Sequence, residues 1–265
     1  MKKHYLLPAL LCLLMIAALG CASTPAKSKL TGSDEDAYTK AMSDFRRGNY
    51  IEAIPVFEEL REKFPMSPYA VLAELRLGDC HYYKEEYIEA SHFFDNFRRL
   101  HPSNPQIAYS IYMRGMCAYQ QVLSKDRDQT FAEEAVEQFQ QLYEIFPQSQ
   151  YAGKALNRIA DAKRQLAGRE IFIGNFYMKK KNYAGAIERY NRALKRYPNQ
   201  IKSDELLLLI GKATICKGDE KRGKKILEFM IKKYPDSVQV ADAKAIIENP
   251  SQAFPPKKPM LQFVD

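Results

Sequence analysis

Five prolines along the chain each follow a bulky residue, and a small residue lies twelve positions before every one of them. The prolines are Pro65, Pro102, Pro147, Pro198 and Pro235, and the small residues are Ala53, Ala90, Ala135, Ala186 and Gly223. Four positions after the small residue comes an aromatic side chain, replaced by leucine in the last case. Successive prolines are 37, 45, 51 and 37 residues apart. Such self-similarity restricts the chain to an array of stacked repeats.

The offsets match the tetratricopeptide signature, in which each unit is a helix-turn-helix. In three units a glycine that follows an aliphatic residue lies twelve positions before the small residue of the second helix. These pairs are Leu77-Gly78, Ile173-Gly174 and Ile210-Gly211. Small residues let paired helices approach closely, an aromatic ring fills the space between them, and proline ends the second helix. We therefore predict an all-α fold, an α-solenoid of about five tetratricopeptide-like helix-turn-helix repeats in two lobes.

The two longer spacings predict insertions. Eight extra residues fall in the third repeat, at about residues 123–130, and 14 fall in residues 152–181, which contain no proline and are expected to form one or two long helices. We place repeats one to three in residues 37–151. Repeats four and five, with the long connecting helix, are expected in residues 152–248.

Residues 249–265 form a proline-rich tail. Pro255, Pro256 and Pro259 preclude a helix there, so the tail is expected to be extended or disordered. Its apolar stretch, residues 260–264, allows two interpretations: an unattached end, or a linear peptide that docks on a neighbour.

Residues 1–20 have the features of a signal peptide, since Lys2 and Lys3 precede an apolar run too short to span a membrane. The Gly20-Cys21 pair that follows is similar to the lipobox of bacterial lipoproteins. This resemblance implies cleavage before Cys21, which would carry a diacylglycerol and an N-acyl group, and residues 21–36 would be the lipidated cysteine and a tether. Two lipid attachments anchor a protein stably at a membrane. The alternative is an uncleaved signal anchor with an incidental cysteine.

The sequence shows no pattern typical of an enzyme. It contains no glycine-rich phosphate loop and no Gly-Xaa-Ser-Xaa-Gly motif, and its histidines and cysteines lack metal-ligand spacing. We predict no catalytic residues, no metal and no cofactor besides the lipid. Cys80, Cys117 and Cys216 lie in apolar helical stretches and are expected to be buried thiols.

The net charge of +8 is carried partly by basic runs such as residues 179–181. These indicate either solvated helix faces or a contact with an acidic protein or lipid headgroup. Acidic residues interleave with the basic ones. A protein exported by a signal peptide rarely meets nucleic acid, so nucleic acid is not expected as a partner.

Several local motifs go beyond generic repeats. They are Phe-Pro-Met-Ser-Pro-Tyr-Ala at residues 64–70, Tyr-Met-Arg-Gly at residues 112–115, Asp-Arg-Asp at residues 126–128 and Pro-Gln-Ser-Gln-Tyr at residues 147–151. Together with the signal and lipobox they resemble the BamD family, also called ComL, over residues 36–244. This resemblance implies a lipid-anchored protein on the periplasmic face of the outer membrane. The implied partners are a BamA-type β-barrel protein, accessory lipoproteins and unfolded outer-membrane proteins.

The same resemblance implies that the N-terminal repeats recognise the C-terminal signal of unfolded outer-membrane proteins. Aromatic side chains could hold an extended peptide that ends in an aromatic residue, and arginines could pair with its carboxylate. The candidates are Phe64, Tyr69, Tyr82, Arg98 and Arg114. Turn packing is the alternative for Phe64 and Tyr69, and an ion pair within the repeat, with Asp126 or Asp128, is the alternative for Arg114.

On the fourth repeat, the resemblance implies that Arg189 contacts the barrel protein. The alternative is that Arg189 forms a solvent-exposed ion pair with a residue one turn away on the same helix. A different function class also stays open: a periplasmic tetratricopeptide lipoprotein that binds peptidoglycan or regulates cell-wall enzymes.

Overall fold

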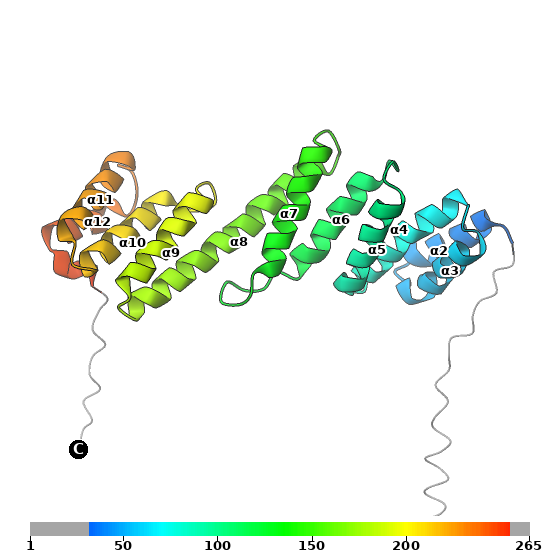
Figure 1. Ribbon diagram of the computed structural model, residues 1–265, viewed down its shortest axis with the longest axis horizontal. Coiled ribbons are helices and arrows are strands. Elements are labelled where there is room, and N and C mark those ends of the chain that lie inside the picture. Colours follow the sequence, from blue (N-terminus) through cyan, green and yellow to red (C-terminus); the bar gives the residue numbers. More distant parts are fainter. Residues whose placement is uncertain (1–31, 255–265) are drawn as a thin grey trace, which may run out of the picture. The chain divides into compact units, whose positions relative to one another are not determined.

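A computed structural model describes residues 32–254 of the chain (Figure 1), and every regular element in that range is a helix. The predicted signal peptide, the lipidated Cys21 and the apolar stretch at residues 260–264 lie outside the described residues.

The first helices are α2 (Asp34–Arg46), α3 (Tyr50–Lys63), α4 (Pro68–Tyr83), α5 (Tyr87–Leu100), α6 (Ile107–Gln120) and α7 (Thr130–Ile145). They are followed by α8 (Ala152–Lys179), α9 (Tyr183–Arg196), α10 (Ser203–Cys216), α11 (Glu220–Lys233), α12 (Val240–Glu248) and the short 3-10 helix η2 (Pro250–Ala253).

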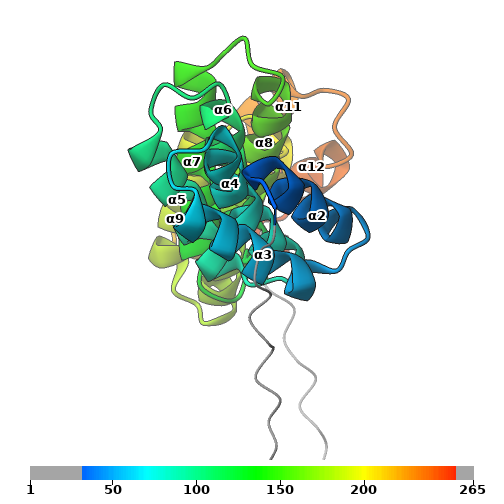
Figure 2. The same ribbon diagram turned by 90° about the vertical axis from the view of Figure 1, so that its right-hand side faces the viewer.

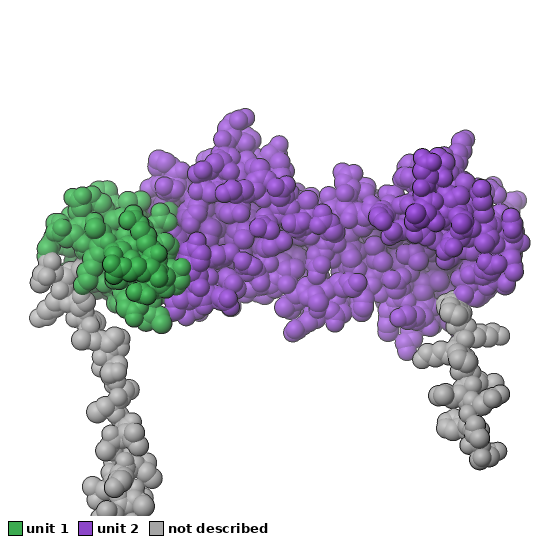
Figure 3. Space-filling model, turned by 180° about the vertical axis from the view of Figure 1, so that it is seen from behind, with its two compact units in different colours: residues 1–76 green, residues 77–265 purple. Residues whose placement is uncertain are grey.

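The chain divides into two compact units, with the boundary after Arg76, inside α4 (Figure 3). In the first unit α2 packs on α3. In the second unit each helix from α5 to α12 packs on the next one along the chain (Figure 1, and turned by 90° in Figure 2), which is the packing of a helical repeat array. The division into lobes at residue 152 stays a prediction.

The repeated prolines end the second helix of each repeat, as expected. Helices α3, α5, α7, α9 and α11 all stop one residue before the bulky residue that precedes the proline. These five capping residues have φ between −126° and −135°, outside the helical region. A proline disfavours the helical conformation of the residue before it, so the sequence itself ends each helix.

Paired helices touch where the sequence has a small residue. A Cβ atom added to the glycine of the first helix would lie 2.4–2.8 Å from the aromatic or leucine side chain of the second helix. The pairs are Gly78 with Phe94, Gly115 with Phe139, Gly174 with Tyr190, and Gly211 with Leu227. These contacts confirm the predicted tetratricopeptide-like solenoid, because the signature residues of both helices meet in every one of these repeats.

Two boundaries differ from the expected ones. The tether was expected to reach residue 36, but α2 already begins at Asp34, where the Ser33 hydroxyl accepts a hydrogen bond from the Asp36 backbone N–H. The tail was expected to be irregular from residue 249, but residues 250–253 form η2. Proline is compatible with the first turn of such a helix, and the Asn249 side chain accepts a hydrogen bond from the Ser251 N–H.

The inserted residues lie where the spacing places them. A loop joins α6 to α7 across residues 121–129, and α8 is one continuous helix of 28 residues. Cys80, Cys117 and Cys216 are buried thiols, and burial raises the pKa of Cys117 to about 12. Among the described helices, none combines the length and apolarity needed to cross a bilayer.

The contact between Gly174 and Tyr190 generates a test of the repeat packing. In Gly174→Ala the new methyl group would overlap the Tyr190 ring, which is fully buried and whose hydroxyl donates a hydrogen bond to Asn175. We expect the free energy of unfolding to fall by about 1–3 kcal/mol in urea denaturation followed by circular dichroism.

Gly168 on the same helix is the matched control, because a Cβ atom added there has no neighbour within 4 Å. Gly168→Ala is expected to raise the free energy of unfolding by about 0.5–1 kcal/mol through helix propensity alone. Equal effects of the two substitutions would contradict the packing role of the glycine.

Candidate functional site

Phe64 and Tyr69 lie in the first unit, at the turn between α3 and α4. Phe64 is the half-buried capping residue of α3, and its carbonyl accepts a hydrogen bond from the Ser67 N–H. The Tyr69 ring packs on the Tyr38 ring, with 5.4 Å between centroids. Desolvation, with the nearby Glu35 carboxylate, raises the pKa of Tyr69. Phe64 therefore lies in the turn, and Tyr69 packs back on α2 and not on the next repeat. Each keeps part of its side chain exposed.

Tyr82 lies at the end of α4, in the second unit, within a cluster of tyrosines. Its ring is 5.6 Å from the Tyr83 ring and 5.5 Å from the Tyr87 ring, and its hydroxyl accepts a hydrogen bond of 2.9 Å from Gln120. Burial raises the pKa of Tyr82, so the phenol stays neutral. Tyr83 is 54% exposed, which leaves an accessible aromatic surface at this end of α4.

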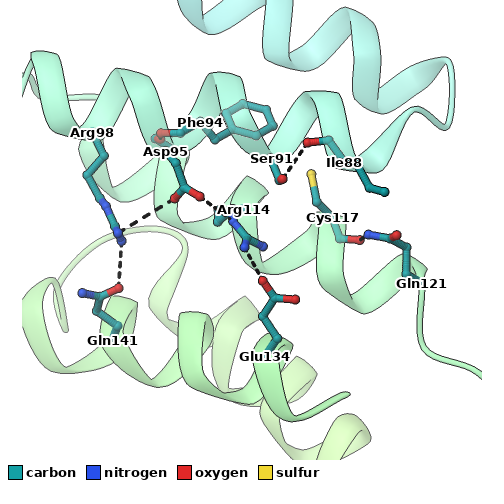
Figure 4. Close-up of polar contacts among 11 residues, drawn as sticks. Ile88, Ser91, Phe94, Asp95, Arg98, Arg114, Cys117, Gln121, Glu134 and Gln141 are labelled. Carbon is teal, nitrogen blue, oxygen red and sulfur yellow. Dashed lines mark hydrogen bonds and ion pairs between the residues drawn. The ribbon is translucent and has the colours of Figure 1, made fainter. Parts of the chain in front are cut away.

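Arg114 on α6 bridges three helices (Figure 4). Its Nε donates to Asp95 on α5 at 2.9 Å, and its guanidinium also donates to Glu134 on α7. Burial disfavours the charge, but the two carboxylates outweigh it and raise the pKa of Arg114. Arg114 thus forms an ion pair within its own repeat, as the alternative expected, but with Glu134 and not with Asp126 or Asp128. Its second pair, with Asp95, joins it to the preceding repeat.

Arg98 on α5 is more accessible than Arg114. Its Nη1 donates to Gln141 on α7 at 2.8 Å, and its Nη2 lies 3.9 Å from the Asp95 carboxylate (Figure 4). A hollow of about 450 Å³ opens beside it, lined by Asp95, Asn96, Arg98, Arg99 and Gln138. Two arginines in this hollow provide fixed donors suited to a carboxylate.

Arg189 on α9 lies 3.2 Å from Glu170 on α8, and its side chain is 26% exposed. Glu170 also lies 3.8 Å from Arg192, so one carboxylate holds two arginines. The ion pair between residues one turn apart on α9 is formed by Arg192 and Glu188 and does not involve Arg189. Arg189 is therefore oriented by the adjacent helix, and part of its side chain remains accessible.

Two larger grooves in the second unit were not anticipated from the sequence. One, of about 660 Å³, runs between α7, α8 and α9, with Glu133, Glu137 and Glu144 facing Lys163 and Arg196. The other, of about 510 Å³, lies between α9, α10 and α11 and is described below. Which side chains share a groove depends on the packing of three helices, and repeat spacing alone does not give that.

The described residues contain no cluster of three or more side chains able to hold a metal ion. The arrangement offers aromatic surfaces, paired arginines and open grooves, which are features of a binding protein.

Comparison with known proteins identifies the family. The sequence profile of the YfiO family, described as "Outer membrane lipoprotein", matches residues 31–220. The chain belongs to this family. A relative from Neisseria gonorrhoeae is 30% identical over 98% of this chain and 94% of its own length, and one from Haemophilus influenzae is 33% identical over 77% and 82%. Both relatives carry the name "Outer membrane protein assembly factor BamD".

Among solved structures, the chain resembles tetratricopeptide proteins. The TPR2AB domain of yeast Sti1 aligns over 83% of this chain and 86% of that chain, with 14% identity and a TM-score of 0.46. The TPR domain of P58(IPK) aligns over 83% of this chain and 57% of that chain, with 14% identity and a TM-score of 0.43.

The pairing of Arg114 with two carboxylates generates a second prediction for this member of the YfiO family. Arg114→Ala removes hydrogen bonds that link α5, α6 and α7, so the free energy of unfolding is expected to fall by about 1–3 kcal/mol in urea. Arg127→Ala, in the exposed α6–α7 loop, is the control and should change it by no more than about 0.5 kcal/mol. An Arg114→Ala protein as stable as the control would show that the bridge does not stabilise the array.

Proposed function

We propose that the protein is a non-enzymatic scaffold lipoprotein of the outer-membrane β-barrel assembly complex. The observation that carries this proposal is the family match over residues 31–220, joined by relatives named as assembly factors across nearly the whole chain. The solenoid adds physical support, since stacked helical repeats present extended surfaces for protein partners. The proposed partners are a BamA-type barrel protein, accessory lipoproteins and unfolded outer-membrane proteins.

The proposed substrate contact is the C-terminal signal of an unfolded outer-membrane protein. Arg98 is suited to its carboxylate because it lines an open hollow with Arg99, whereas the guanidinium of Arg114 already holds two carboxylates. We therefore assign Arg98 the direct contact and Arg114 the role of fixing Asp95, which Arg98 also approaches. Phe64, Tyr69 and Tyr82 are proposed to supply aromatic surface to the same class of ligand.

The proposed anchor is the lipid on Cys21. If lipid alone holds the protein at the membrane, Cys21→Ser is expected to shift it from the membrane pellet to the soluble fraction in high salt. The measurement is fractionation followed by immunoblotting, with Cys216→Ser, a buried thiol, as the control. Retention of Cys21→Ser protein in the pellet at the same mass as wild type would refute the lipid anchor and favour the uncleaved signal anchor.

The proposed barrel-protein contact is tested at Arg189 by a detergent pull-down of the tagged full chain, with mass spectrometry. Wild type is expected to capture a large β-barrel protein with periplasmic repeats. Arg189→Glu is expected to reduce that capture at least about fivefold, because reversing a charge at a contact repels the partner. Capture of cell-wall enzymes without a barrel protein would favour the alternative function class.

Because Arg189 pairs with Glu170, the single substitution also places two carboxylates side by side. The double variant Arg189→Glu/Glu170→Arg restores the internal ion pair without restoring the positive charge at position 189. Under our proposal it is more stable than the single variant, although Arg192 loses its contact with Glu170, and it does not regain the capture. If it regains capture as well, Arg189 acts only through its pair with Glu170 and does not contact the partner.

A further inference from the structure

The groove between α9, α10 and α11 combines an apolar floor with a basic rim. Its floor contains Ile187 from α9, Leu207 and Ile210 from α10, and Ile226 from α11. The rim contains two exposed cations, Lys217 and Arg222, and one carboxylate, Asp219, which accepts a hydrogen bond from the Arg222 backbone N–H. Within residues 32–254 neither of these cations forms an ion pair with a carboxylate side chain. At about 510 Å³ the groove is large enough for the side chains of a short peptide.

The end of the described chain is attached beside this groove. Helix η2 packs on α10 and α12, and the Cys216 thiol lies 3.3 Å from the Ala253 carbonyl oxygen (Figure 1). Cys216 directly precedes Lys217 of the groove rim. The chain beyond Ala253 therefore starts next to one end of the groove, and Phe254 at its start is 48% exposed.

The segment after Phe254 can reach the groove. Successive residues of a helix are separated by about 100°, so Cys216 and the groove residue Lys217 are joined by an arc of about 10 Å over the helix surface. The six steps from Phe254 to Met260 would span about 19 Å at 3.1 Å per residue in the extended conformation that prolines favour.

The chemistry of the segment matches the groove. Met260, Leu261, Phe263 and Val264 are apolar, as the floor is, and Asp265 supplies a carboxylate for the cationic rim. We propose that residues 260–265 occupy the α9–α11 groove of their own chain, with the apolar side chains on the floor and Asp265 next to Lys217 and Arg222. A short link keeps such a peptide at an effective concentration in the millimolar range, so a weak contact suffices to occupy the groove.

The occupied groove would be a regulated binding surface. A partner peptide of the same character, apolar with an acidic residue, would have to displace the tail before it binds. This assignment is independent of the proposed assembly function, because it concerns a contact within one chain.

Photo-crosslinking of the full, untagged chain tests the proposal. Phe263 is replaced with the aromatic photo-crosslinker p-benzoylphenylalanine, the protein is irradiated, and the attachment points are located by mass spectrometry. We expect crosslinks within one chain to segments of residues 187–226 that line the groove. The same label at Val238, which is 83% exposed and outside the groove, measures background.

Two charge reversals on α11 sharpen the test. Arg222→Glu places a negative charge on the rim and is expected to lower the crosslink yield at least about threefold through repulsion of Asp265. Lys225→Glu makes the same change in net charge on an exposed position that does not line the groove, and should leave the yield unchanged. Both variants must show the circular dichroism of wild type.

Three results would overturn the assignment. Crosslinks between two copies would make the occupant a second chain. Crosslinks to other surfaces would place the tail elsewhere. A yield no higher than that of the Val238 label would mean that the groove is not occupied by the tail.

Discussion

The contact between a glycine on one helix and a ring or leucine on the next sets the register of this protein. Fixing that one contact also fixes its neighbours in sequence. Arg114 precedes Gly115 on α6, and the contact of Gly115 with Phe139 on α7 accompanies the pairing of Arg114 with Glu134 on that same helix. In the fourth repeat, Arg189 precedes Tyr190, and Glu170 lies one turn before Gly174. The charged residues of the candidate sites thus depend on apolar contacts made beside them.

The repeat fold could be predicted from the sequence because its signals are local. A proline acts on the residue before it, and a glycine permits the approach of a ring at a fixed offset. The same reasoning located the α6–α7 insertion and the long helix. It placed the end of the tether too late, at residue 36. The small and charged residues that were assigned to the tether include Ser33 and Asp36, which form the N-terminal cap of α2. The same reasoning missed η2, which packs on α12 and also on α10, far away in sequence.

The candidate site was predictable by residue type but not by pairing. Arginines near aromatic residues indicated a surface for a carboxylate ligand, and Arg98 does line an open hollow. That Arg114 is held by Asp95 and Glu134 follows from the relative rotation of three helices, which repeat spacing does not specify. Asp95 lies near both arginines, so a ligand carboxylate at Arg98 would approach a cation whose own partner is already shared.

The uninterrupted α8 has a mechanical consequence. At 1.5 Å per residue, its 28 residues form a rod about 42 Å long, and this rod packs against α7 as well as α9. A straight helix resists compression and bending far more than two shorter helices joined by a turn. A displacement of α9 would therefore reach α7 through one rigid element, because α8 contains no turn that could take it up.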